Sequence, residues 1–172
     1  MSRSVIVSVM LAAFVFGGHA ATAQEAASPA VAVPKAVLKL LEARWKGWRL
    51  ATVDNVGACA ATLNGRSPSF VRADLNGDGT EDVALQITTN DGTRIIAVIS
   101  RLGDDAELIE VDQVSGAPEV LGFGQRGKKF SPSDLVQVDY FGMDTLTASR
   151  CEKTTTAYFW MGAGFRKRVI VL

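Results

Sequence analysis

The nine residues from Asp74 to Asp82, DLNGDGTED, are the stretch of this 172-residue chain whose residue types and spacing specify a chemistry. Acidic or amide side chains stand at the first, third, fifth and ninth positions, and the glycine at the sixth permits a sharp reversal of the backbone. Ca²⁺ accepts about six to eight oxygen ligands in flexible geometry. The expected ligands are the side chains of Asp74, Asn76, Asp78 and Asp82 and the backbone carbonyl of Thr80, with water completing the shell.

The residues after the loop distinguish it from an EF-hand. An EF-hand needs a bidentate glutamate at position 12, and that position is Leu85 here. Residues 83–89 are rich in β-branched side chains and predict a strand, so the loop should lead into a sheet. Asp, Asn and Gly are also common turn residues, and a metal-free loop is therefore the alternative. Arg72 is then the nearest counter-charge in the sequence.

Together with the lead-in Phe70–Ala73, the segment FVRADLNGDGTEDVALQI resembles the FG-GAP or VCBS-type repeat. The resemblance implies a strand-loop-strand unit that binds calcium through the acidic positions, which fall on Asp74, Asn76, Asp78 and Asp82. Members with several copies form β-propellers. This chain has one clear copy, so the resemblance implies neither a propeller nor the adhesive roles of that family.

The N-terminus predicts export. Arg3 precedes an apolar run over residues 5–16 that is too short for a permanent membrane span, and small residues at 21–23 suit a cleavage site. We expect a signal peptide over residues 1–23, a flexible tether over 24–33 and a single domain over 34–172, with the mature protein periplasmic or secreted. Cys59 and Cys151 then form a disulfide, because the compartment is oxidising.

Composition excludes several functions. The only histidine, His19, lies in the predicted signal peptide, so the mature chain has no Ser-His-Asp or Cys-His arrangement. No recognisable catalytic motif is present, and a net charge of +0 does not suggest a nucleic-acid partner. We expect a non-enzymatic calcium-binding module whose partner is an unknown protein or an envelope polysaccharide. The alternative is an envelope enzyme or an inhibitor of a cell-wall-degrading enzyme, with the basic segment 126–129 or an acidic pair as the working surface.

The remaining pattern predicts an α+β fold, mainly antiparallel β-sheet with one N-terminal amphipathic helix. Apolar residues at helical spacing predict a helix that begins at Pro34 and ends at Gly47, with Trp45 and Trp48 packed in the core. Residues 116–133 look the least structured. Strands are expected over 48–53, 83–89, 93–100, 106–113, 135–141, 145–150, 154–161 and 165–172. A two-residue turn at Asp91-Gly92 would place Ile87 opposite Ile96.

Overall fold

The computed structural model describes residues 33–52, 56–57, 59–60, 63, 66–101, 106–127, 129–130, 139–140, 143–150 and 154–171. The predicted signal peptide and all but the last residue of the predicted tether lie outside this part of the chain. The described elements are α1 (Lys35–Arg44), β1 (Arg49–Leu50), β2 (Phe70–Ala73), β3 (Asp82–Thr89), β4 (Gly92–Ser100), β5 (Ala106–Val114), β6 (Val120–Gly124), β7 (Lys129–Phe130), β8 (Asp139–Tyr140), β9 (Thr145–Arg150), β10 (Thr154–Trp160) and β11 (Phe165–Val171).

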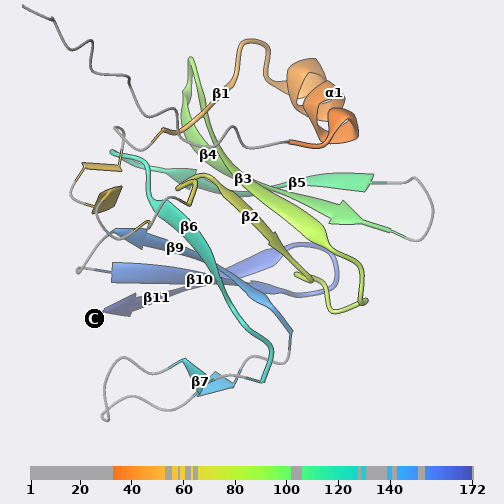
Figure 1. Cartoon of the computed structure of the whole chain (residues 1–172), viewed down its shortest axis with the longest axis vertical. Coiled ribbons are helices and arrows are strands. Elements are labelled where there is room, and N and C mark those ends of the chain that lie inside the picture. Colours follow the sequence, from red (N-terminus) through yellow and green to blue (C-terminus); the bar gives the residue numbers. More distant parts are fainter. Residues whose placement is uncertain are drawn as a thin grey trace, which may run out of the picture.

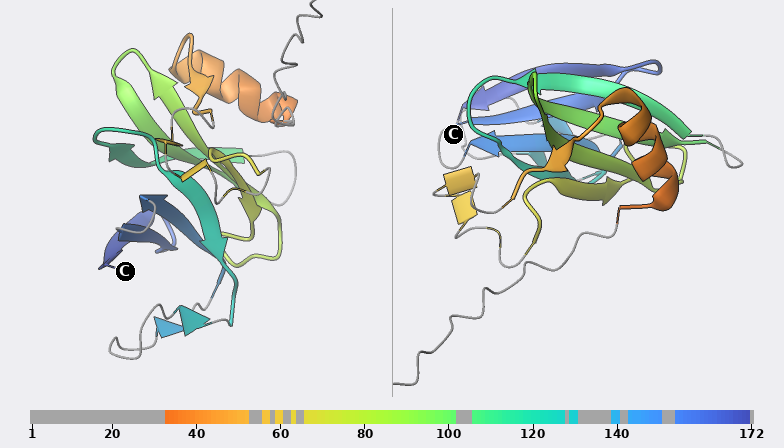
Figure 2. Two further views of the ribbon diagram at one scale, coloured as in Figure 1. Left: turned by 60° about the vertical axis from the view of Figure 1, so that its left-hand side comes forward. Right: turned by 90° about the horizontal axis from the view of Figure 1, so that it is seen from above.

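Two antiparallel sheets form the body of the molecule, and α1 packs on the outer face of the first (Figure 1). The first sheet has the order β1-β3-β4-β5, with β2 also paired to β3. The second sheet has the order β11-β10-β9-β6, and β7 and β8 form a separate two-stranded pair. The left view of Figure 2 shows the helix, the first sheet and the second sheet following one another from top to bottom. The predicted fold class, mainly antiparallel β-sheet with one N-terminal helix, is confirmed.

The helix buries one narrow face. Val37 and Leu41, one helical turn apart, are 4% and 0% exposed and lie against the outward side of β3 and β4. Trp45 and Trp48 pack around the same cluster, as predicted, while the Trp45 N–H caps the helix on the Leu41 carbonyl at 2.7 Å. Pro34 is the residue before the helix. A second cluster fills the space between the sheets and includes Val71, Leu75, Ala84, Ile95, Ala97, Ile99, Leu121, Leu146, Ala148 and Tyr158.

The β3–β4 hairpin has a different register from the predicted one. Thr89 pairs with Gly92, so the turn residues are Asn90-Asp91, and Ile96 lies opposite Leu85 instead of Ile87. The Thr89 hydroxyl accounts for this turn, because it accepts the Asp91 N–H at 3.2 Å and donates to the Gly92 carbonyl at 3.1 Å. The register differs by two residues, an even number. The predicted division of side chains between the two faces is therefore correct.

Residues 116–133 contain strands that the sequence did not predict. β6 pairs with β9 along its whole length and completes the second sheet, and β7 also falls in this range. Glycines at 122 and 124 weakened the strand signal, although sheet pairing tolerates them at an edge. Of the first predicted strand, 48–53, the structure describes residues 48–52, of which Arg49–Leu50 form β1. Of the predicted strand 135–141, the structure describes only β8, which pairs with β7 and lies apart from the β9–β11 meander.

A β-bulge shifts the register between β4 and β5. Ile95 pairs with Asp112, whereas its neighbour Ile96 pairs with Glu110, so Val111 is the extra residue. Ile95 belongs to the core between the sheets and Ile96 to the core beneath the helix. Glu110 and Asp112 consequently lie on opposite faces of the sheet, although a regular strand would put them on the same one.

Two further sequence predictions touch the described residues only in part. Cys59 is 6% exposed and packs with Val56 and Leu63, and no described cysteine is free. Its predicted partner, Cys151, lies outside the described residues, so the pairing stays a prediction. Within the described part of the chain, no helix has the length and apolar character needed to cross a bilayer.

Candidate metal centre

The loop from Asp74 to Glu81 connects two paired strands. Ala73 at the end of β2 lies opposite Asp82 at the start of β3, and pairing continues to Phe70 opposite Leu85. The strand-loop-strand arrangement predicted for this segment is therefore present. The loop closes directly over the first residue pair of the ladder, and this pair fixes where its two ends lie.

Asp74 organises the first half of the loop. Its Oδ1 accepts the Gly77 N–H at 2.8 Å, and its Oδ2 accepts the Gly79 N–H at 3.0 Å. Gly77 and Gly79 have φ values of +80° and +86°, a conformation that side-chain-bearing residues rarely adopt. The predicted reversal at Gly79 is confirmed, and the conformations of the two glycines turn their own N–H groups toward the Asp74 carboxylate.

Asn76 and Asp78 continue the same pattern. The Asp78 N–H donates to Asn76 Oδ1 at 2.9 Å, the Thr80 N–H donates to Asp78 Oδ1 at 2.7 Å, and Asn76 Nδ2 donates to Asp78 Oδ2 at 2.8 Å. The hydrogen bonds from Asn76 and Thr80 lower the pKa of Asp78. Its exposed carboxylate is therefore ionised in neutral solution.

Asp82 closes the loop from below and is fully buried, with 0% of its surface exposed. Oδ2 accepts the N–H groups of Leu75 at 2.9 Å and Asn76 at 3.3 Å, while Oδ1 accepts that of Ser100 at 2.8 Å. Burial raises the pKa of this carboxyl to about 6, and the nearby charge of Asp78 adds to the rise while the backbone N–H groups oppose it.

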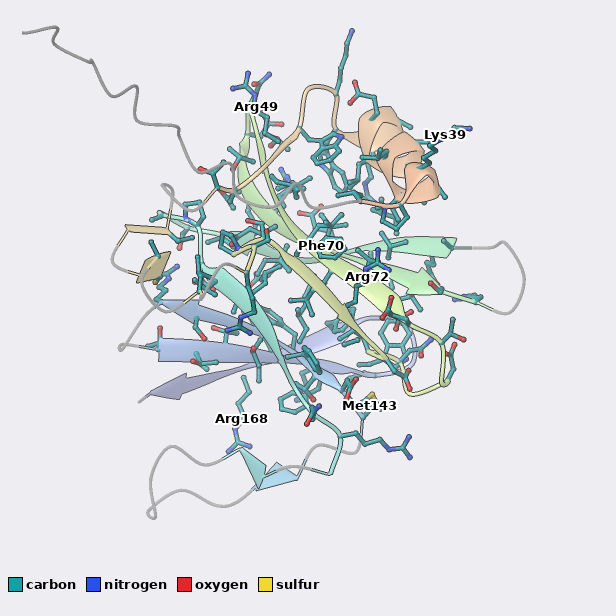
Figure 3. The ribbon with its side chains drawn as sticks, in the orientation of Figure 1. Lys39, Arg49, Phe70, Arg72, Met143 and Arg168 are labelled. Atoms are coloured by element: carbon teal, nitrogen blue, oxygen red, sulfur yellow. The ribbon has the colours of Figure 1, made fainter. Side chains whose placement is uncertain are left out.

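Two residues outside the predicted ligand set, Asp144 and Ser100, bond to the loop or to Asp82 at its end. Asp144, which precedes β9, accepts the Asp74 N–H on Oδ2 at 3.2 Å and the Arg126 N–H on Oδ1 at 2.9 Å. A Cβ atom added to Gly77 would lie 3.5 Å from Met143 Cβ, and Figure 3 shows Met143 near the loop. No sequence spacing indicated Asp144 or Ser100, because both reach the loop only through the folding of distant strands.

The predicted counter-charge Arg72 pairs with Glu81 at 2.9 Å, and its guanidinium lies 5.4 Å from the centre of the Phe70 ring. Among the described residues, no three His, Cys, Asp or Glu side chains are grouped closely enough to hold a metal ion. One loop and the residue that follows it contain the five predicted ligands, Asp74, Asn76, Asp78, Thr80 and Asp82. In this arrangement the three carboxylates accept hydrogen bonds from backbone N–H groups. Coordination would require the three carboxylates to approach one another.

The fold and the loop define a class: a two-sheet antiparallel β protein with one helix and an Asp/Asn/Gly loop at a sheet corner. No protein-family model, curated protein or solved structure matches the chain.

Proposed function

We propose that this chain is an exported, non-enzymatic binding or structural domain in which the loop from Asp74 to Asp82 binds one Ca²⁺ ion. The observation that carries the proposal is the burial and the raised pKa of the Asp82 carboxyl. This carboxyl is fully buried, and its pKa is raised to about 6 by burial and by the charge of Asp78. Three backbone N–H groups bond to it, but a buried carboxylate whose pKa is also raised by the charge of Asp78 favours a cation nearby.

The donor set suits a hard cation. Asp74, Asn76 and Asp78 use some of their side-chain oxygen lone pairs for the turn hydrogen bonds described above, and each carboxylate oxygen has a second lone pair. These turn bonds also limit how far the side chains can move. The cation would shorten the separations between carboxylates and offset their repulsion, which would fix the corner where β2 passes into β3.

Calcium titration followed by calorimetry and by thermal unfolding tests the proposal. One site is expected, with a dissociation constant of roughly 10⁻⁴ to 10⁻³ M, because the loop lacks the bidentate glutamate of tighter sites. Calcium at about a hundred times that constant should stabilise the fold by about 2.7 kcal/mol. A chain that shows neither heat of binding nor a change in melting temperature would instead have a metal-free turn.

Two substitutions in the loop separate coordination from general electrostatics. Asp78→Asn removes a charge from a proposed ligand and retains an oxygen that can accept the Thr80 N–H. Glu81→Gln removes a charge from an exposed neighbour outside the ligand set. Coordination predicts a loss of about tenfold or more in calcium affinity for Asp78→Asn and a change of about twofold or less for Glu81→Gln. Equal losses in the two variants would indicate a diffuse ion atmosphere.

A further inference from the structure

A polar cavity of about 320 Å³ lies between the end of β5 and strands β9, β10 and β11 of the second sheet. Ligand pockets in proteins usually fall between about 300 and 1,000 Å³, so its size suits a small molecule. Its lining is formed by Asp112, Gln113, Val114, Ser115, Glu119, Arg150, Thr154, Thr156, Tyr158, Lys167 and Val169. None of these residues belongs to the loop from Asp74 to Asp82, and the inference below does not depend on calcium binding.

One wall of the cavity is built around Asp112, which the β5 bulge directs toward the second sheet. The Tyr158 hydroxyl donates to Asp112 Oδ2 at 3.0 Å, and Lys167 Nζ lies 3.1 Å from both carboxylate oxygens. Tyr158 is 2% exposed, and burial, followed by the negative charge of Asp112, raises its pKa. The hydroxyl therefore keeps its proton and holds the carboxylate in a fixed position.

A second part of the lining is built around Glu119, whose side chain is only 8% exposed. Gln86, which is fully buried, fixes its backbone from both directions: Nε2 donates to the Glu119 carbonyl at 2.6 Å, and Oε1 accepts the Glu119 N–H at 2.9 Å. Arg150 Nε donates to Glu119 Oε1 at 2.6 Å, and its Nη2 donates to the Ser115 carbonyl at 2.8 Å. Glu119 lines the cavity, and its other oxygen, Oε2, has no hydrogen-bond partner among the described residues.

We propose that this cavity binds a neutral, polyhydroxylated ligand of monosaccharide size. Its four charged side chains form two ion pairs, Arg150 with Glu119 and Lys167 with Asp112, so the lining carries no excess charge. A charged ligand would have to displace one member of a pair and leave its partner uncompensated.

A sugar hydroxyl can bind without displacing either pair. It donates to a carboxylate oxygen such as Glu119 Oε2 and accepts from the adjacent cation, so neighbouring hydroxyls on one ring match the side-by-side donors and acceptors of an ion pair. The hydroxyls of Thr154 and Thr156 add neutral hydrogen-bonding groups, and Val114 and Val169 offer apolar contact for the C–H face of a ring.

Amide chemical shifts of the ¹⁵N-labelled chain, titrated separately with glucose, galactose, N-acetylglucosamine and glycine, test this inference. At least one of the three sugars should produce saturable shifts at Val114, Thr156 and Val169, whereas zwitterionic glycine should not. Saturable binding of glycine at these residues, or no saturation by any sugar at tens of millimolar, would overturn the proposal. Calcium titration of the same sample reports separately on the loop, so failure of one proposal is distinguishable from failure of the other.

A pair of matched substitutions on β10 locates the binding. Thr156 lines the cavity, whereas Thr155, the adjacent residue, points to the opposite face of the strand and bonds to Ser149 at 2.9 Å. Thr156→Val should weaken sugar binding about fivefold or more, the equivalent of one lost hydrogen bond, and Thr155→Val should change it about twofold or less. Unchanged affinity in folded Thr156→Val, checked by its spectrum, would place the sugar elsewhere and refute the site.

Discussion

The buried carboxylate of Asp82 bonds to the backbone N–H of Ser100 at 2.8 Å, so the first residue of β3 is tied to the last residue of β4. The other oxygen of the same carboxylate accepts the N–H groups of Leu75 and Asn76. One side chain thus joins the loop to the far end of the hairpin. For this role both side-chain oxygens of Asp82 must accept hydrogen bonds, whether or not a cation is bound.

Asp82→Asn should therefore destabilise the fold. An amide presents one oxygen and one NH₂ group, so at least one buried N–H would face a donor and lose its partner. The expected loss is about 1–3 kcal/mol in the free energy of unfolding, measured by urea denaturation in buffer containing a chelator. Asp91→Asn, at an exposed turn position, is the control and should change stability by less than about 0.5 kcal/mol. Equal stability of the two variants would contradict this role for Asp82.

The raised pKa of Asp82 predicts how the metal-free protein responds to pH. The folded carboxyl has a pKa of about 6 against an ordinary value of 3.8, so between these values the folded state binds more protons than the unfolded state. This group consequently lowers the free energy of unfolding as pH rises from about 4 to about 6. The lowered pKa of Asp78 has the opposite sign and acts below that window, where stability is lost on acidification.

Carbon-13 NMR of the Asp82 carboxyl, recorded with a chelator present, gives its titration midpoint directly. Urea denaturation across the same pH range measures the effect on stability, and the Asp82→Asn variant should lack the contribution of this group. A midpoint near the ordinary aspartate value would contradict the prediction.

Asp144 should matter to the loop although it lies outside it. Asp144→Ala leaves the Asp74 and Arg126 N–H groups without their acceptor. The free energy of unfolding should fall by about 1–3 kcal/mol where both groups stay out of contact with water, and by less where water replaces the carboxylate. Hydrogen exchange at the Asp74 amide provides the local readout and should accelerate. Unchanged exchange at Asp74 would show that this contact does not hold the loop against β9.

The helix should contribute to stability through one face only. Leu41 is 0% exposed and Leu38, on the same helix, is 38% exposed. Leu41→Ala should lower the free energy of unfolding by about 2–5 kcal/mol, the usual range for a cavity in a packed core. Leu38→Ala should lower it by less than about 1 kcal/mol. Urea denaturation of both variants measures the difference. Similar losses would mean that α1 is not anchored on the first sheet through Leu41.

The sequence predicted best the features that depend on residues close together along the chain. The reversal at Gly79 and the strand-loop-strand connection from Phe70 to Leu85 follow from local turn chemistry and β-branched patterning. The faces of the β3–β4 hairpin followed from alternation, but the register did not, because the Thr89 hydroxyl selects between two neighbouring turns.

Contacts between distant segments could not be read from local patterns. Asp144 is 70 residues from Asp74, and Gln86 is 33 residues from Glu119, so neither pair has a sequence signature. The strand β6 was missed for a related reason: its glycines argue against a strand, and pairing with β9 overrides that preference.

The extra residue in β5 has a consequence for how the chain tolerates change. Because Val111 is an extra residue, the two acids of this strand lie on different faces of the sheet. Glu110 contacts Arg94 on the face that carries the helix, and Asp112 contacts Tyr158 on the face toward the second sheet. A chain shortened by that single valine would join Glu110 directly to Asp112, and strand alternation would still place the two acids on opposite sides. Tyr158 and Lys167 would then keep Asp112 opposite them, so the strand could lose this residue without losing the anion of the cavity.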